Sequence, residues 1–265
     1  MQQTKSKALS HPLPRLFLRR FTALTLFIVC GAADARLLPV LPDGGFSACK
    51  QFFAGGKVPV FQASAPPKTR PLCYDAFAVL HSGTTKTPLY VAERINRAGL
   101  LEAAGEKRAT RFFADARLPQ SERAALDDYK HSGYARGHMA PAANMGSPEA
   151  MAQSFSLANM VPQAPRNNQG PWAGIEKATR KYAMRASGDV YVITGPVFDA
   201  SGEAIGAGRV RVPRYLFKLV YDPASQRAWA HWLENSEQAR TGRPIDYPEL
   251  VRRTGIEFLP GLTVR

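Results

Sequence analysis

Cysteine, histidine and acidic residues are all scarce in this chain. Its 265 residues include 3 Cys, 5 His and 21 Asp or Glu, against 35 Lys or Arg. The sequence has no Cys-x-x-Cys or His-Glu-x-x-His spacing, which excludes the common zinc-site signatures. It also shows no internal repeat, which excludes a repeat architecture. Because 45% of the residues are hydrophobic, the chain can bury one sizeable core, and we expect a single elaborated domain.

The shortage of acidic residues leaves the chain strongly basic. Its formal net charge is +14 and its pI is about 10.0. Such a balance favours a polyanionic partner, above all nucleic acid. General solubility and attraction to an anionic membrane surface would produce the same balance, so the charge alone leaves these alternatives open.

An apolar run at residues 21–30 is too short to span a bilayer as a mature helix. It follows a basic region that ends at Arg20, and small residues at Ala33 and Ala35 come after it. This order is typical of a secretory signal peptide, which we predict for residues 1–35, with an uncleaved anchor as the alternative. We therefore expect a periplasmic or secreted protein with no stable membrane insertion after cleavage.

Cleavage of that peptide would remove Cys30 and leave Cys49 and Cys73. Two cysteines in an exported protein most simply form one disulfide, and a two-cysteine metal site is the alternative. The disulfide would stabilise the fold by about 3 kcal/mol through loop closure. It would join an irregular arm, expected at residues 36–70 from their Gly and Pro content, to a domain spanning residues 71–265.

Hydrophobic periodicity predicts several strands and helices. We expect strands at residues 74–81, 88–92, 156–160, 189–194, 209–212, 215–221 and 228–233. We expect helices at residues 123–129, 148–154, 171–186 and 244–251. Pro171 can occupy the first turn of its helix, where a missing N–H costs nothing. Residues 94–132 are charged and poorly periodic, with a short extended piece at 111–113.

The most informative segment is residues 133–143, GYARGHMAPAA, in which His138 follows an Arg-Gly pair. A second polar cluster comes about thirty residues later. The polar residues of the two segments are Arg136, His138, Asn159, Asn167, Asn168, Glu176 and Arg180. A histidine, an amide, a carboxylate and two arginines in this spacing suggest a site that binds a metal ion and a phosphate group.

These motifs resemble the DNA/RNA non-specific endonuclease family, whose fold carries a ββα-metal finger. The family's Asp-Arg-Gly-His is matched by residues 135–138, with Ala135 in place of the aspartate, and its Asn-x7-Glu-x3-Arg by Asn168, Glu176 and Arg180. The similarity runs in order from about residue 74 to residue 258. It implies an α+β fold with a mixed or antiparallel sheet core and a ββα-metal finger active site. It also implies an Mg²⁺-dependent endonuclease, with Mn²⁺ as a substitute, that cuts DNA and RNA without strong sequence preference.

The resemblance and the chemistry of the side chains together assign roles. His138 would act as a general base on water, because an imidazole titrates near neutrality. Asn168 would be the Mg²⁺ ligand through its amide oxygen, although Asn167 is next to it and either could be a turn residue or a helix cap. Glu176 would bind metal-bound water.

The remaining roles concern phosphate and support. Arg136 and Arg180 would hold phosphate oxygens. An ordinary helix ion pair between Glu176 and Arg180 is the alternative for those two residues. Asn159 would support the site from the neighbouring strand, or simply make a buried structural hydrogen bond.

Two functions of different classes therefore stay open. The first is an exported nuclease, which the retained His138, Asn168, Glu176 and Arg180 favour. The second is a nucleic-acid-binding protein with weak or no catalysis, which Ala135 favours. A nuclease toxin is a third, but no delivery domain is visible. DNA and RNA are the expected partners, and a homodimer and an inhibitor protein are further ones that we consider.

Overall fold

The computed structural model describes residues 45–200 and 202–265, so the predicted signal peptide lies outside the described residues. Its centre is a seven-stranded sheet with the order β12-β11-β10-β7-β4-β3-β2, in which every neighbouring pair is antiparallel. The strands are β2 (Thr69–Cys73), β3 (Phe77–Ser82), β4 (Thr87–Ile95), β7 (Val190–Val197), β10 (Tyr215–Asp222), β11 (Arg227–Glu234) and β12 (Ile245–Asp246). The α+β class with an antiparallel sheet core is confirmed.

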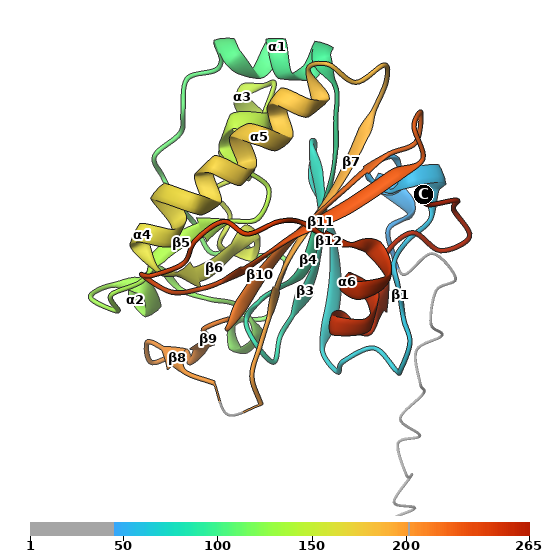
Figure 1. Ribbon diagram of the computed structural model, residues 1–265. Helices are drawn as coiled ribbons and strands as arrows, with labels where there is room; N and C mark the ends of the chain where they lie inside the picture. The colour runs from blue at the N-terminus through green and yellow to red at the C-terminus, as the bar shows by residue number, and fades with distance from the viewer. Residues whose placement is uncertain (1–44, 201) are drawn as a thin grey trace, which may run out of the picture. The chain divides into compact units, whose positions relative to one another are not determined.

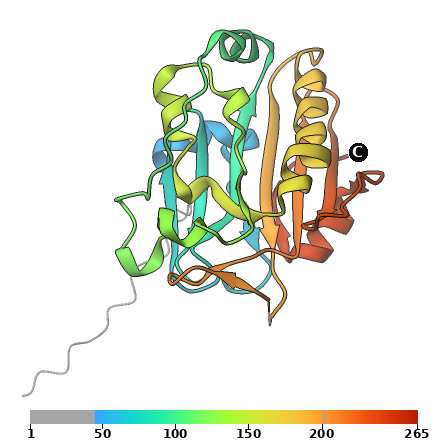
Figure 2. The same ribbon diagram turned by 90° about the vertical axis from the view of Figure 1, so that its left-hand side faces the viewer.

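The central strands are mostly apolar on both faces because both faces of the sheet are covered. On one face, Ala92 and Phe217 pack with the 3-10 segment η1 (Ser47–Phe52) and helix α6 (Tyr247–Thr254). On the other, Val91 and Leu216 pack with helices α3 (Pro148–Gln153) and α5 (Ala173–Ala183). Figures 1 and 2 show α3 and α5 on the opposite side of the sheet from α6. Alternation of side chains along each strand thus builds two separate hydrophobic layers.

A ββα unit lies on the α5 side of the sheet. Strands β5 (Ala135–His138) and β6 (Met160–Gln163) form an antiparallel pair, and helical residues follow β6 directly. The strand predicted at residues 156–160 is wrong in position, because residues Leu157–Asn159 form a 3-10 turn (η5) and the strand begins at Met160. The Ser156 hydroxyl accepts a hydrogen bond from the Ala158 N–H, which favours the turn over an extended chain.

The helix after β6 begins earlier than its sequence suggests. Pro165 occupies its first turn in α4 (Pro165–Asn167), and a π-helical segment, η6 (Asn168–Trp172), joins α4 to α5. Pro171 therefore lies inside the helical segment, which corrects the prediction that it starts the helix. Proline cannot donate the usual backbone hydrogen bond and crowds the preceding turn, and the wider π turn accommodates both effects.

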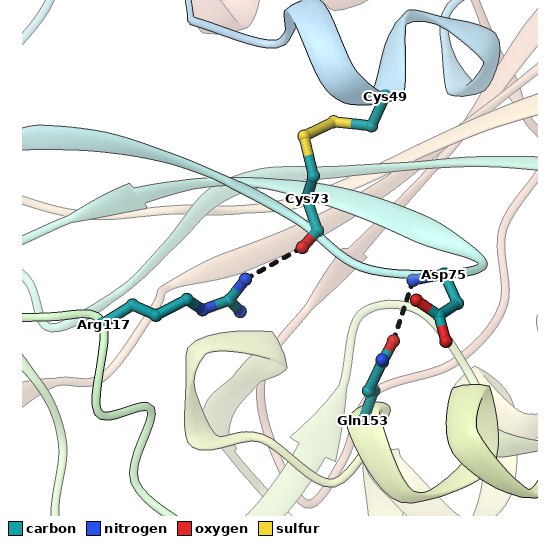
Figure 3. The surroundings of a disulfide bond; sticks show 5 residues. All are labelled: Cys49, Cys73, Asp75, Arg117 and Gln153. Carbon is teal, nitrogen blue, oxygen red and sulfur yellow. Dashed lines mark hydrogen bonds between the residues drawn. A yellow bond between two sulfur atoms is a disulfide. The ribbon is translucent and has the colours of Figure 1, made fainter.

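The described part of the predicted irregular arm, residues 45–70, is only partly irregular. Phe46, Phe52 and Phe53 are buried in the core, and β1 (Val60–Phe61) pairs with β13 (Ile256–Glu257). A disulfide joins Cys49 to Cys73 with 5.6 Å between the Cα atoms, so that prediction is confirmed (Figure 3). The aromatic residues between the turns therefore belong to the core, and the boundary at residue 71 stays a prediction.

The charged region before β5 contains a helix that periodicity did not reveal. Helix α1 (Arg97–Gly105) begins after Asn96, whose side chain accepts a hydrogen bond from the Gly99 N–H at 2.9 Å. Only two of its residues are buried, so its sequence carries little amphipathic signal. Short elements complete the described chain: η2 (Ala54–Gly56), η3 (Gln120–Glu122), α2 (Leu126–Tyr129), η4 (Ala142–Asn144), β8 (Ala204–Ile205) and β9 (Val210–Arg211). Among the described helices, none is long and apolar enough to cross a membrane.

Candidate active site

A cavity of about 410 Å³ opens at the ββα unit. Four of the residues predicted for the site line it, namely Arg136, His138, Asn168 and Glu176. They come from β5, from the π-helical segment and from α5, so the fold brings two sequence clusters into one space. The other two predicted residues, Asn159 and Arg180, are not among the residues that line this cavity.

His138 ends β5 and packs against two aromatic rings that also contact each other, with 4.8 Å between their centroids. The ring centroids of Phe155 and Phe112 lie 4.9 Å and 5.9 Å from its own. Burial, assisted by the nearby Arg108 charge, lowers the pKa of His138 to about 3. The imidazole is therefore neutral at neutral pH, which is the form that can accept a proton. A pKa this low makes it a weaker base than a free imidazole, which corrects the expectation that it titrates near neutrality.

Gly137 allows β5 and β6 to lie close together. A Cβ atom at this position would collide with the side chain of Gln163, which is fully buried on β6. The glycine thus fixes the separation of the two strands beside both Arg136 and His138. Arg136 and His138 both reach the cavity because side chains alternate along a strand, which places these two residues on the same face of β5.

The two adjacent asparagines have different environments. Asn167 is fully buried and its Nδ2 donates a 2.8 Å hydrogen bond to the Glu234 carbonyl on β11. Asn168 is partly exposed and lines the cavity. Of the two amides, Asn168 is therefore the one that faces the cavity, and its role as the metal ligand stays a prediction.

Glu176 lies in the first turn of α5 and is partly exposed, at the wall of the cavity. Burial raises the pKa of its carboxyl group, while the charges of Lys218, Arg180 and Arg108 oppose this rise. Arg180 lies one turn further along α5 and lines an adjoining cavity, which shares Arg108 with the first one. Its Nη1 atom donates a 3.4 Å hydrogen bond to the Asn144 Oδ1 atom.

Two arginines with aromatic supports line the cavity. The guanidinium carbon of Arg136 lies 4.3 Å from the ring centroid of Phe112, and that of Arg108 lies 5.2 Å from the ring centroid of Phe155. Stacking restrains each planar group while leaving its N–H donors free for a phosphate. Arg108 was missed in the sequence because it follows α1 in a segment with no periodic signal.

Asn159 contacts backbone atoms rather than the cavity. Its Oδ1 accepts from the Ala140 N–H, and its Nδ2 donates to the carbonyls of Ala140 and Ser154, each at 2.9 Å. The residue is fully buried. These contacts match the structural alternative considered for Asn159, and they hold the turn that follows His138. Its direct catalytic role stays a prediction.

The donor set at the cavity fits a largely hydrated hard cation. The described residues hold no group of three or more His, Cys, Asp or Glu side chains that could enclose a metal ion. One amide oxygen at Asn168, with the Glu176 carboxylate in the same cavity, leaves most coordination positions to water and phosphate oxygens, as Mg²⁺ commonly requires. Ala135 also lines the cavity and offers no side-chain oxygen.

Comparison with known proteins adds an independent observation. A family model described as DNA/RNA non-specific endonuclease matches residues 55–264. The mitochondrial nuclease EXOG of Danio rerio is 32% identical over 216 residues, which cover 71% of this chain and 60% of that protein. The mitochondrial endonuclease G of Homo sapiens is 32% identical over 217 residues, which cover 73% of this chain and 68% of that protein.

A solved structure of EndoG in complex with EndoGI is similar in fold. Its TM-score is 0.66 at 22% sequence identity, and the match covers 76% of this chain and 90% of that chain. This chain spans about 60% of the length of the EXOG relatives from Danio rerio and Homo sapiens.

Proposed function

Because the chain belongs to the DNA/RNA non-specific endonuclease family, we propose that it is a metal-dependent nuclease that hydrolyses phosphodiester bonds in DNA and RNA. The observation that carries this proposal is the shared cavity of His138, Asn168, Glu176 and Arg136. It joins a proton acceptor, a cation ligand and a phosphate-binding group in one place. These are the parts that phosphodiester hydrolysis requires.

Each residue has a distinct task in this reaction. The neutral imidazole of His138 accepts a proton from a water molecule, whose oxygen forms a bond to phosphorus as the bond to the leaving oxygen breaks. Arg136 and Arg108 stabilise the charge that develops on the phosphate oxygens. Asn168 would hold Mg²⁺, or Mn²⁺ in its place, with Glu176 accepting hydrogen bonds from its waters. When bound, the cation would neutralise phosphate charge and assist the leaving oxygen.

Little sequence preference is expected, because the cavity offers arginine contacts to phosphate. Phosphate contacts carry no base identity. The formal net charge of +14, which is +10 without residues 1–35, supports binding to either nucleic acid. DNA and RNA are therefore both proposed as substrates.

A plasmid-nicking assay tests the activity directly. With Mg²⁺ we expect nicks spread over the plasmid, and with EDTA we expect none. His138→Ala should abolish turnover while nucleic-acid binding in a gel-shift assay is retained, since the imidazole acts on water. Absence of cleavage by the wild-type protein with any divalent cation would favour the second candidate, a nucleic-acid-binding protein with weak or no catalysis. The observation that favours this second candidate is Ala135, which lines the cavity where the family has an aspartate.

We also propose export to the periplasm or the exterior after removal of residues 1–35. The disulfide between Cys49 and Cys73 supports an oxidising compartment. The EXOG and endonuclease G relatives are named as mitochondrial proteins. Cell fractionation with N-terminal sequencing tests the proposal. A mature chain that begins near residue 36 in the exported fraction is expected, and an intact N-terminus in the cell interior would contradict it.

Partners other than nucleic acid are a separate proposal. The solved EndoG structure is a complex with EndoGI in which EndoG is inhibited. An inhibitor protein and a homodimer are proposed for this chain by analogy alone. Light scattering on purified protein measures the mass in solution, and a single-chain mass at high concentration would reject the homodimer.

A further inference from the structure

A buried lysine lies beneath the proposed active site. Lys218 on β10 is only 1% exposed, and its Nζ atom donates a 2.6 Å hydrogen bond to Thr194 Oγ1 on the neighbouring strand β7. The two residues are directly opposite each other in the strand register. A buried ammonium group is costly unless charges and hydrogen bonds compensate it, so its surroundings indicate what it does.

The Lys218 side chain reaches the turn that follows His138. Its Nζ atom contacts the Met139 carbonyl oxygen at 3.4 Å. The Met139 N–H donates to the Asn159 carbonyl at 3.0 Å, and the Asn159 side chain holds Ala140. Hydrogen bonds therefore hold this turn to Asn159, which lies just before β6, and to Lys218 in the seven-stranded sheet. His138 is the residue immediately before it.

The charge of the same lysine acts on two carboxyl groups, those of the buried Glu93 and the partly exposed Glu176. Burial lowers the pKa of Lys218, and the charges of Glu93 and Glu176 oppose this effect. Burial raises the pKa of Glu93 on β4 to about 7, with the Lys218 charge as the largest opposing influence. Glu93 Oε1 also accepts a 2.9 Å hydrogen bond from Asn144 Nδ2. The Nζ atom of Lys218 lies 5.3 Å from the ring centroid of Trp172, at the start of the helix that carries Glu176.

We propose that Lys218 is a positioning residue of the nuclease site. Its ammonium group attaches the Met139 carbonyl to the central sheet, fixes the His138 imidazole through the backbone, and supplies the positive charge beneath Glu176. Lys218 does not line the cavity, so it acts through these residues and does not touch the substrate. The proposal rests on the nuclease function proposed above.

A purely structural role for Lys218 makes a different prediction. If the lysine served only to neutralise Glu93, removing both charges together would restore stability and activity alike. A matched pair of variants separates the two roles. Lys218→Met keeps the length of the side chain without its charge, and Lys218→Met combined with Glu93→Gln removes the uncompensated carboxylate as well.

The expected result is a loss of rate that stability does not explain. Lys218→Met should lower kcat by about 10–100-fold, as loss of a supporting partner typically does, with KM nearly unchanged. The double variant should regain most of the thermal stability but not kcat. Asp222→Asn is the control, because Asp222 is a buried, hydrogen-bonded charge at the far end of the same strand. It should lower stability without changing kcat.

Two kinetic results would overturn the proposal. One is a wild-type kcat in the double variant, which would show that Lys218 only compensates Glu93. The other is an equal fall in kcat for Asp222→Asn, which would make the loss a general effect of instability. If Lys218→Met alone does not fold, the double variant still decides between the roles.

Nuclear magnetic resonance of the metal-free protein supplies a readout that does not need activity. The imidazole nitrogen signals of His138 can be assigned by comparison with His138→Ala. We expect them to shift in the double variant. His231 pairs with Lys218 across the strands and would report the lost charge alone. A shift confined to His231 would overturn the positioning role. Failure of the wild-type protein to cleave would instead reject the nuclease function and leave this measurement intact.

Discussion

The carboxamide of Asn159 makes a reciprocal pair of hydrogen bonds with the backbone of Ala140, each 2.9 Å long. This pair holds the backbone two residues after His138. Asn159→Asp keeps the acceptor but places a carboxylate oxygen against the carbonyls of Ala140 and Ser154. We expect the free energy of unfolding to fall by about 1–3 kcal/mol, the cost of leaving a buried partner unsatisfied.

The rate should also fall in Asn159→Asp, because the imidazole of His138 is no longer fixed. Urea unfolding and single-turnover cleavage measure the two effects. Asn96→Ala is the control, since it removes the cap of α1 at a cost of about 1 kcal/mol and should leave the rate unchanged. A destabilised Asn159→Asp protein with a wild-type rate would show that this turn does not position the base.

The adjacent residues Asn167 and Asn168 allow a test in which each variant is the control of the other. Asn168→Ala should raise the Mg²⁺ concentration needed for half-maximal rate, with little change in thermal stability, because the side chain lines the cavity. Asn167→Ala should lower stability by about 1–3 kcal/mol, because the Glu234 carbonyl loses its buried partner. Magnesium titrations and thermal unfolding of both variants give the comparison. The reverse pattern would assign the metal to Asn167.

Restoring an aspartate at Ala135 tests what its absence costs. A carboxylate here would reach the cavity and could order metal-bound water or the side chain of Arg136. Such supporting groups matter by about 10–100-fold in affinity or activity. Ala135→Asp should therefore raise the initial rate at limiting Mg²⁺ more than at saturating Mg²⁺. Unchanged or lower rates at every concentration would mean that the site does not lack this group.

Asp115 should make stability depend on pH in the acid range. Burial alone would raise the pKa of its carboxyl group, but hydrogen bonds from Arg117 and Tyr74 outweigh burial and lower the pKa from 3.8 to about 2. The lower folded-state pKa stabilises the protein above about pH 4, and this contribution is lost as the pH falls through about 2. Acid unfolding followed by fluorescence should show a steeper loss in wild type than in Asp115→Asn. Parallel curves would contradict the assignment.

Arg117 links that carboxylate to the disulfide region. Its Nη1 atom donates a 2.9 Å hydrogen bond to the Cys73 carbonyl (Figure 3). The acid-sensitive contact thus joins the edge strand β2 to the segment before β5.

Local patterns in the sequence predicted most of the sheet, the disulfide and four residues of the cavity. They succeeded where a residue type has few roles, as with His138 behind Arg-Gly, or where apolar residues follow a strand pattern. They failed where tertiary contacts decide the structure. Arg108 reaches the cavity from a segment without periodicity, and Lys218 looks like one polar residue in an apolar strand. Only the strand register reveals that it faces the buried layer beneath α5.

The π-helical segment means that the geometry of the site depends on the number of residues as well as on their identity. Asn168 begins this segment, and Glu176 lies beyond it in regular α-helix. Deleting one residue between them, such as Gln169, would rotate one side chain relative to the other by about 100° around the helix axis, given 3.6 residues per turn. Every side chain that lines the cavity would still be present in such a protein. The side chains of Asn168 and Glu176 would then no longer point in the same direction around the helix axis. The length of the π-helical segment is therefore itself part of the site.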